Sequence, residues 1–287
     1  MANRLEKITE WILTLSALVS AFITVLIFVF LLIFGLPLLQ GGQWFDLLAS
    51  PWSPREGLYG IRPMLLGTVY ISLLGMAFAF PLSFGCAALI SVFAPRSFGG
   101  FLRKVVQLMT GIPTVVYGFV GIFLLVPMVR EILQGGSGMC LLTASLMLSI
   151  LISPTLILFF VDGFDRAPRS HLDAVAALGG NEMQQFIFVI LPNAWSNVLS
   201  GIVLAFGRVL GDTLIALMIA GNAVQVPGSV LESARTLTAH VALVIAADYD
   251  SPEFKSIFAC GLTLYLFSAM MVVLIRSIGA ISGRKKR

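Results

Sequence analysis

The sequence predicts an all-α membrane protein with six transmembrane helices. Of the 287 residues, 58% are hydrophobic and only 11% are charged, whereas soluble domains carry about 25% charged residues. Long charge-free runs recur along the chain, and each meets the roughly 18–20 residues needed to cross the hydrocarbon core of a bilayer. These runs predict helices at about residues 11–38, 64–94, 105–129, 139–161, 194–220 and 256–276.

The positions of Lys and Arg predict how these helices are oriented. Six spans place both termini on one side; 12 of the 18 basic residues fall on that side, five on the other, and Arg208 lies within a span. Cytoplasmic loops carry the excess of Lys and Arg, so we expect residues 1–10 and the basic tail 281–287 in the cytoplasm. The net charge of +4 follows from this asymmetry and does not indicate nucleic-acid binding.

Two opposite charges occupy the segment LSGIVLAFGRVLGDTLIALMIAGN, residues 199–222. Arg208 and Asp212 lie one helical turn apart in a predicted span, where a single charge costs roughly 2.5–3.5 kcal/mol. One interpretation is a brace, in which the two charges neutralise each other and hold helices together. The other is a polar pathway, because intramembrane ionisable groups commonly mark a substrate route. Gly207 and Gly211 have the GxxxG spacing that lets another helix approach closely.

The loop at residues 162–193, DGFDRAPRSHLDAVAALGGNEMQQFIFVILPN, predicts two short helices outside the membrane. Ser170 and Asp173 form a capping-box pattern, and Gly179-Gly180 is a helix stop, which predicts a helix over residues 171–178. Asn181 is suited to cap the second helix. Helical spacing puts the following residues on its buried face, before Pro192 ends it: Met183, Phe186, Ile187, Ile190 and Leu191.

This loop resembles the EAA loop of bacterial ABC-importer permeases. Asp173-Ala174-Val175, three residues, Gly179, nine residues and Val189-Ile190-Leu191-Pro192 keep the spacing of that motif, with Asp in place of its Glu. The resemblance implies that the first helix is a coupling helix that docks on an ATPase subunit. The residues implicated in coupling are Ser170, His171, Leu172, Asp173, Ala174, Val175, Ala176, Gly179 and Gly180.

Two further segments resemble the phosphate-specific (Pst) permeases, and more closely their PstC-type subunit. These are TGIPTVVYGFVGIFL, residues 110–124, and GRVLGDTLIALMIAGN, residues 207–222, in which the family usually has Glu where this chain has Asp212. The resemblance implies a type I importer permease (MetI-like) core over residues 64–280 in a bacterial inner membrane. The implied partners are a homodimeric ATP-binding subunit, a PstA-like second permease and a periplasmic or lipid-anchored phosphate-binding protein.

A phosphate route makes chemical sense of the two buried charges. Arg presents a planar fork of donors that matches a phosphate oxyanion, and Asp212 can accept a hydrogen bond from an anion that still carries a proton. Sulfate has no such proton to donate at neutral pH. We therefore expect Arg208, Asp212 and the adjacent Thr213 to line the substrate pathway, without a catalytic residue, cofactor or metal.

Other functions stay open from the sequence. A permease for molybdate or sulfate is the main alternative, and a secondary anion transporter is a more distant one, because the paired broken helices typical of many such transporters are not recognisable. The sequence contains no GxxxxGK[ST] phosphate-binding loop, so ATP hydrolysis is expected in a partner. On the outer side, residues 231–247 predict an interfacial helix, and His171 and His240 are expected to be polar surface residues.

Overall fold

The computed structural model describes residues 2–35, 47–134 and 136–284. Within them the regular secondary structure is helical apart from a hairpin of two antiparallel strands, β1 (Trp52–Ser53) and β2 (Leu58–Tyr59), joined by the 3-10 turn η2 (Pro54–Glu56). A search of these residues finds six helical segments long and apolar enough to cross a membrane, as predicted. They are Glu6–Gly35, Arg62–Phe93, Thr114–Leu133, Leu141–Asp165, Glu182–Gly211 and Pro252–Ser277.

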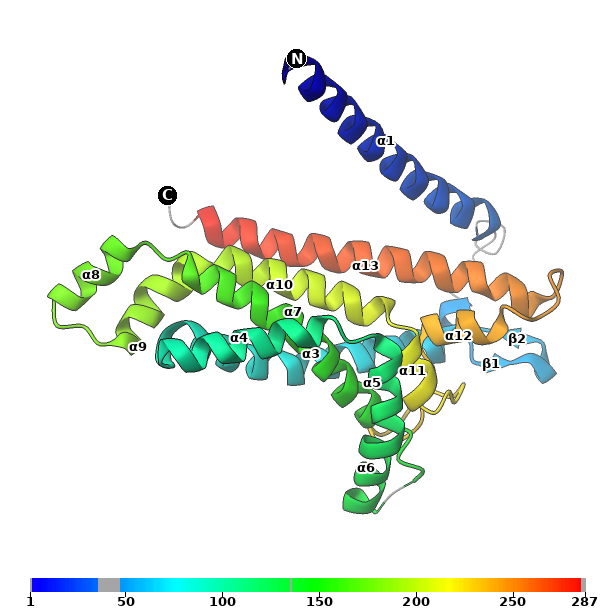
Figure 1. Ribbon diagram of the computed structural model, residues 1–287. Helices are drawn as coiled ribbons and strands as arrows, with labels where there is room; N and C mark the ends of the chain where they lie inside the picture. Colours follow the sequence, from blue (N-terminus) through cyan, green and yellow to red (C-terminus); the bar gives the residue numbers. More distant parts are fainter. Residues whose placement is uncertain (1, 36–46, 135, 285–287) are drawn as a thin grey trace.

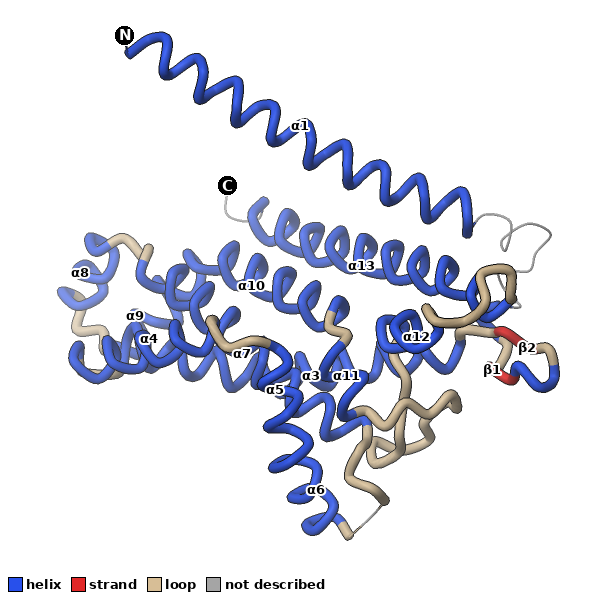
Figure 2. The backbone as a smooth tube through the Cα atoms, turned by 45° about the vertical axis from the view of Figure 1, so that its right-hand side comes forward, coloured by secondary structure: helices blue, strands red, loops and turns tan. Residues whose placement is uncertain are grey.

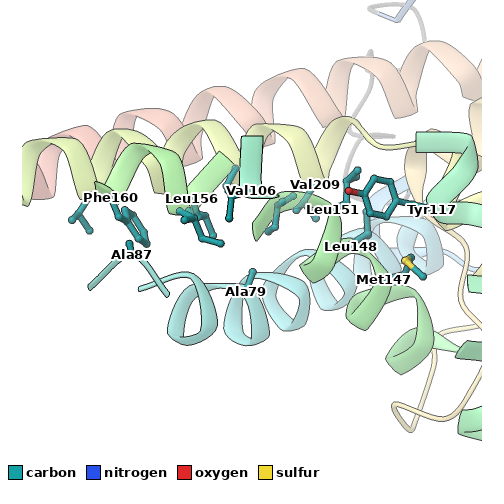
Figure 3. Packing of buried hydrophobic residues seen from close by; sticks show 14 of the residues in the cluster. Ala79, Ala87, Val106, Tyr117, Met147, Leu148, Leu151, Leu156, Phe160 and Val209 are labelled. Atoms are coloured by element: carbon teal, nitrogen blue, oxygen red, sulfur yellow. The ribbon is translucent and has the colours of Figure 1, made fainter. Parts of the chain in front are cut away.

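Helix α7 (Leu141–Asp165) lies at the centre of the bundle, between α3 (Arg62–Ala88) and α10 (Leu191–Gly211). Its most apolar 18-residue stretch is 72% buried, whereas no other candidate span exceeds 28%. Small side chains of α3, such as Ala79 and Ala87, face the larger Leu156 and Phe160 of α7 (Figure 3). Small residues at such an interface let two backbones approach closely.

Helices α1 (Ala2–Gly35) and α13 (Pro252–Arg284) pack against each other. Their contact includes ring pairs Phe28–Tyr265 and Phe34–Phe258, with centroids 4.7 and 5.1 Å apart. The apolar stretch of α1 is 0% buried within the chain, and α1 diverges from α13 toward its N-terminal end (Figures 1 and 2). The predicted first span extends to residue 38, but residues 36–38 lie outside the described residues.

The third span lies further along the chain than the predicted 105–129, at Thr114–Leu133. In this region the chain forms α4 (Arg96–Thr110), which follows the π-helical turn η3 (Leu89–Phe93), and then α5 (Thr114–Val120), the π-helical η4 (Gly121–Leu125) and α6 (Val126–Leu133). Pro113 has extended backbone angles, φ −62° and ψ 144°, and a proline disfavours helical geometry in the residue before it. The helix direction therefore changes between α4 and α5 (Figure 1).

Pro192 does not end a helix, contrary to the prediction. The segments α9 (Glu182–Gln185), η5 (Phe186–Ile190) and α10 run on without a break, and Pro192 stands in the first turn of α10, after the π-helical turn η5. The Asn193 side chain donates to the Val189 carbonyl at 2.7 Å. Phe186 and Ile190 are buried as expected, but Met183 and Ile187 are 51% and 46% exposed, so the predicted buried face is only half correct.

The predicted interfacial helix over residues 231–247 is also shorter and more buried than expected. Helix α12 (Leu237–Val244) starts only after a loop that is fastened to the end of α11 (Leu214–Ile219). The Ala234 amide donates to the Ala220 carbonyl at 2.8 Å, and the Asn222 amide donates to the Ala234 carbonyl at 3.1 Å. Leu237 and Ala239 are 0% exposed, so the start of this helix packs inside the end of the bundle that carries the hairpin.

Candidate functional site

The predicted fifth span, 194–220, is broken at Asp212. Helix α10 ends at Gly211, Asp212 is extended with φ −73° and ψ 124°, and α11 begins at Leu214. The Oδ2 atom of Asp212 accepts a hydrogen bond from the Ile215 amide at 2.9 Å. Asp favours such capping of a new helix over continuation of the old one, because its short side chain competes for backbone amides.

A pocket of about 450 Å³ opens at this break. Its lining unites the three predicted pathway residues, Arg208, Asp212 and Thr213, with Thr114, Gly211 and Leu214. Thr114 is the first residue of α5, so the pocket lies where two interrupted helices meet. Sequence reasoning missed Thr114 as a lining residue, although the Gly-Ile-Pro sequence before it signals a helix break.

Arg208 and Asp212 do not form the expected one-face pair. The ion pairs of the described residues within 4.0 Å are Arg103–Asp165 and Arg166–Asp162. The Arg208 Nη1 atom instead donates to Thr155 Oγ1 on α7, at 3.4 Å. The reason is geometric: α10 ends before Asp212, so the carboxylate leaves the helical face that carries Arg208.

Gly207 and Gly211 meet open space within this chain. A Cβ atom built on either residue finds nothing within 4 Å, so their predicted packing role stays a prediction that requires another subunit. Close packing occurs instead between α5–η4 and α11. A Cβ built on Gly118 would lie 2.5 Å from Met218 Sδ, and one built on Gly121 would lie 2.2 Å from Ile219 Cδ1.

The predicted coupling helix is present as α8 (Arg169–Ala177). Ser170 does not cap it, because the helix starts two residues earlier than predicted, at Arg169, with Pro168 at the N-cap. The capping box is found instead at Asn181, whose side chain accepts from the Gln184 amide at 2.9 Å. Gly179 has φ +80°, in the left-handed region, so the predicted glycine stop is confirmed.

Most of α8 is free of contact with the rest of the chain. No residue of α8 is buried, His171 and Asp173 are exposed, and Leu178 at its end is 90% exposed. Polar contacts fix the root of the loop: Arg103 bonds Asp165 at 2.9 Å, and the Asn197 side chain donates to Asp162 at 3.1 Å. These contacts tie the base of the loop to α4 and α10, and α8 lies at the end of the bundle (Figure 1).

His240 is not a surface residue, contrary to the prediction. It is 0% exposed, its Nε2 atom lies 3.1 Å from Ser256 Oγ, and its Nδ1 atom lies 3.5 Å from the Arg235 Nη1 atom. The Trp52 ring of the hairpin packs edge-to-face against the His240 ring, with centroids 4.4 Å apart. Burial, together with the nearby Arg235 charge, lowers the pKa of His240 to about 4. Sequence gave no sign of this cluster because its members are far apart along the chain.

Six spans, a polar pocket at a broken span and an exposed helix on the loop between two spans define a multi-pass membrane permease. The chain belongs to the family described as binding-protein-dependent transport system inner membrane component, which it matches over residues 79–284. It is thus a membrane subunit of an ABC transporter, and ATP hydrolysis resides in a partner subunit.

Named relatives and solved structures agree with this assignment. The chain is 32% identical to the probable ABC transporter permease protein YqgH of Bacillus subtilis, covering 96% of this chain and 90% of the relative. It is 28% identical to the phosphate transport system permease protein PstC of Xylella fastidiosa, covering 83% and 78%. The fold is that of a type I importer permease: a bacterial ABC transporter involved in alginate import matches with a TM-score of 0.66, at 15% identity, over 96% of both chains.

Proposed function

We propose that this chain forms the translocation pathway for inorganic phosphate in an ATP-driven ABC importer. The observation that carries the proposal is the pocket at the α10–α11 break, where Arg208, Asp212, Thr213 and Thr114 converge. Similarity to permeases named for phosphate transport supports the same substrate. The Arg208 guanidinium is always charged and offers a fork of donors to an oxyanion.

The composition of the pocket suits an anion that retains a proton. Arg208 and the hydroxyls of Thr114 and Thr213 can donate to phosphate oxygens. Asp212 supplies the one carboxylate of the lining, and it can accept from a P–OH group. A fully ionised anion such as sulfate offers the carboxylate no donor and meets like-charge repulsion, so the same pocket discriminates against it.

The coupling helix and the remaining partners belong to the same proposal. Helix α8 is exposed, and an ion pair ties the base of its loop to α4, which suits docking on an ATP-binding homodimer. The open face at Gly207 and Gly211 suits a second, PstA-like permease, and the hairpin end of the bundle suits a phosphate-binding protein. In this arrangement α8 and both termini are cytoplasmic, and the hairpin faces the outside.

Uptake of labelled phosphate by the reconstituted complex tests the proposal. We expect ATP-dependent uptake that excess unlabelled phosphate suppresses and equal excesses of sulfate and molybdate do not. Arg62→Gln is the control for loss of a positive charge, because Arg62 is exposed and does not line the pocket. Preferential inhibition by molybdate or sulfate would assign the pathway to that oxyanion instead.

A further inference from the structure

We propose that Thr238 on α12 is a positioning residue for the pocket and that it acts through the backbone of Asp212. Its Oγ1 atom donates a hydrogen bond to the Asp212 carbonyl at 2.9 Å, from 26 residues further along the chain. The pocket lining does not include Thr238. Its influence on a bound anion is therefore indirect.

Asp212 needs support because it lies outside both neighbouring helices. Its extended ψ of 124° separates α10 from α11. The peptide group whose oxygen Thr238 binds also carries the amide nitrogen of Thr213, and both Asp212 and Thr213 line the pocket. The orientation of this carbonyl is set by ψ of Asp212, which also sets the direction in which the chain continues into Thr213 and α11, so the Thr238 hydroxyl holds the break that shapes the pocket.

The Thr238 hydroxyl is itself held by a chain of hydrogen bonds. The Ala239 amide donates to Thr236 Oγ1 at 3.1 Å, and Thr236 Oγ1 lies 3.0 Å from Thr238 Oγ1. Because the proton of Thr238 is directed to Asp212, the Thr236 hydroxyl must be the donor in the middle step. Consecutive bonds of this kind polarise and strengthen one another.

Helix α12 is anchored to α3 at its first turn. The Leu237 amide donates to Thr68 Oγ1 of α3 at 2.9 Å, and both residues are buried. Gly67 lets the two backbones approach, because a Cβ there would lie 2.4 Å from the Arg235 carbonyl oxygen. Helix α12, which carries Thr238, is thus fixed to the long helix α3.

The far side of α12 is anchored to the outer end of the bundle. His240 contacts Ser256 of α13 at 3.1 Å and the Trp52 ring of the hairpin at 4.4 Å. Figure 1 shows α12 between α11 and the first turns of α13, near the hairpin. A displacement of the hairpin or of α13 therefore reaches Asp212 through α12 and one hydroxyl group.

Two measurements on three variants of the assembled transporter test the inference. Thr238→Val removes the hydroxyl at nearly constant shape, and Thr238→Ser retains it. Thr143→Val is the matched control, because Thr143 is buried and its hydroxyl donates to the Gly138 carbonyl at 2.7 Å, away from the pocket. Hydrogen exchange is followed in peptides covering residues 212–219, and the KM and kcat of phosphate uptake are measured in parallel.

We expect Thr238→Val to raise the KM of phosphate uptake about three- to tenfold, which corresponds to the loss of one hydrogen bond. We also expect it to increase the rate of hydrogen exchange at residues 212–219. Thr238→Ser should match the wild type, and Thr143→Val should lower only the thermal midpoint. Unchanged exchange and KM in Thr238→Val, or equal defects in the Ser and Val variants, would overturn the inference. If Thr238→Val does not accumulate, Thr238→Ala takes its place with the same expectations.

The uptake measurement rests on the proposed function, whereas hydrogen exchange does not. A wild-type complex that imports no phosphate would contradict the proposed substrate. Faster exchange in Thr238→Val alone would still support the positioning role of Thr238.

Discussion

The Arg208 guanidinium donates to the Thr155 hydroxyl on α7, at 3.4 Å between Nη1 and Oγ1, and makes no ion pair within 4.0 Å with Asp212 in the described part of the chain. Arg208 is exposed, whereas Asp212 is half-buried and capped onto α11. Arg208 therefore lies in the last turn of α10 and Asp212 in the helix break, and both line one pocket without forming an ion pair. An anion between them could contact both.

Removal of the Arg208 charge should abolish transport without loss of the protein. We expect Arg208→Gln to lower phosphate uptake at least about tenfold, because a charge-assisted hydrogen bond contributes about 1.5–3 kcal/mol. Arg208→Lys should retain part of the activity, since an ammonium cannot reproduce the bidentate fork. Phosphate uptake and the amount of each variant protein in the membrane are measured separately.

The change Asp212→Asn should be milder and should alter selectivity. The amide oxygen can still accept from the Ile215 amide, but it no longer repels a fully ionised anion, so inhibition by sulfate should increase. The double variant Arg208→Gln/Asp212→Asn completes a cycle. Because no ion pair joins the two residues, we expect no recovery of uptake; recovery would show that they only brace each other.

The turn after α8 should tolerate only glycine at position 179. Gly179→Val forces a β-branched residue into φ +80°, where even an unbranched residue costs roughly 1–2 kcal/mol. We expect loss of phosphate uptake with normal membrane insertion, because α8 is reoriented. Gly100→Val is the control, since it adds the same side chain in open space and without a positive φ. Normal uptake with a normal amount of bound ATPase in Gly179→Val would refute a coupling role.

Single cysteines should report the orientation of the bundle. In a background without Cys86, Cys140 and Cys260, a cysteine at position 56 should react with an impermeant thiol reagent only from outside. Cysteines at 178 and 284 should react only from the cytoplasm. Residue 178 is 90% exposed as leucine, so a lack of access would not explain a negative result. Labelling of positions 56 and 284 from one face would overturn the six-span topology.

The exposed glycine pair should matter for assembly and not for the fold of this chain. A Cβ on Gly207 meets nothing within 4 Å, so Gly207→Leu should leave the free energy of unfolding of the isolated chain within about 0.5 kcal/mol of wild type, as for other surface changes. We expect a reduced yield of co-purified second permease, because the larger side chain blocks close helix approach. Gly121→Leu should show the opposite pattern, since a Cβ there would lie 2.2 Å from Ile219 Cδ1.

Acid should destabilise the hairpin end of the bundle through His240. Its folded-state pKa of about 4 lies below the usual 6.5, so unfolded chains bind the extra proton between these values. Stability is then complete above about pH 6.5 and falls by up to about 1.4 kcal/mol per pH unit down to pH 4. The fall in thermal midpoint from pH 7 to pH 5 should shrink in His240→Asn, with His171→Asn as the exposed control. An identical fall in all three proteins would exclude His240 as the source.

The neutral form of His240 also follows from its partners. The guanidinium of Arg235 can only donate, so Nδ1 is the acceptor at 3.5 Å and the ring proton resides on Nε2. That proton is directed to Ser256 Oγ at 3.1 Å, and the Ser256 hydroxyl donates to the Glu253 carbonyl at 2.6 Å. A second proton on the ring would give His240 a positive charge, which the nearby Arg235 guanidinium would repel.

Hydrophobic runs were enough to find all six spans, because the bilayer requires about 20 apolar residues wherever a helix crosses it. The glycine stop at Gly179 was equally visible, since a left-handed residue is needed to end α8. The residues of the pocket were visible as charges in an apolar segment. All of these signals are local, or depend only on the solvent around the chain.

Tertiary structure decided where the helices break and what each polar side chain contacts. The apolar sequence around Arg208 and Asp212 predicted an unbroken helix, whereas in the structure Asp212 caps a new helix, α11, which packs against α5 and α12. The place of Thr114 in the pocket and the burial of His240 could not be predicted for the same reason. The residues that each of them contacts lie far away along the chain. Periodicity reports which face of a helix is apolar, but it carries no record of which distant hydroxyl or ring will meet that face.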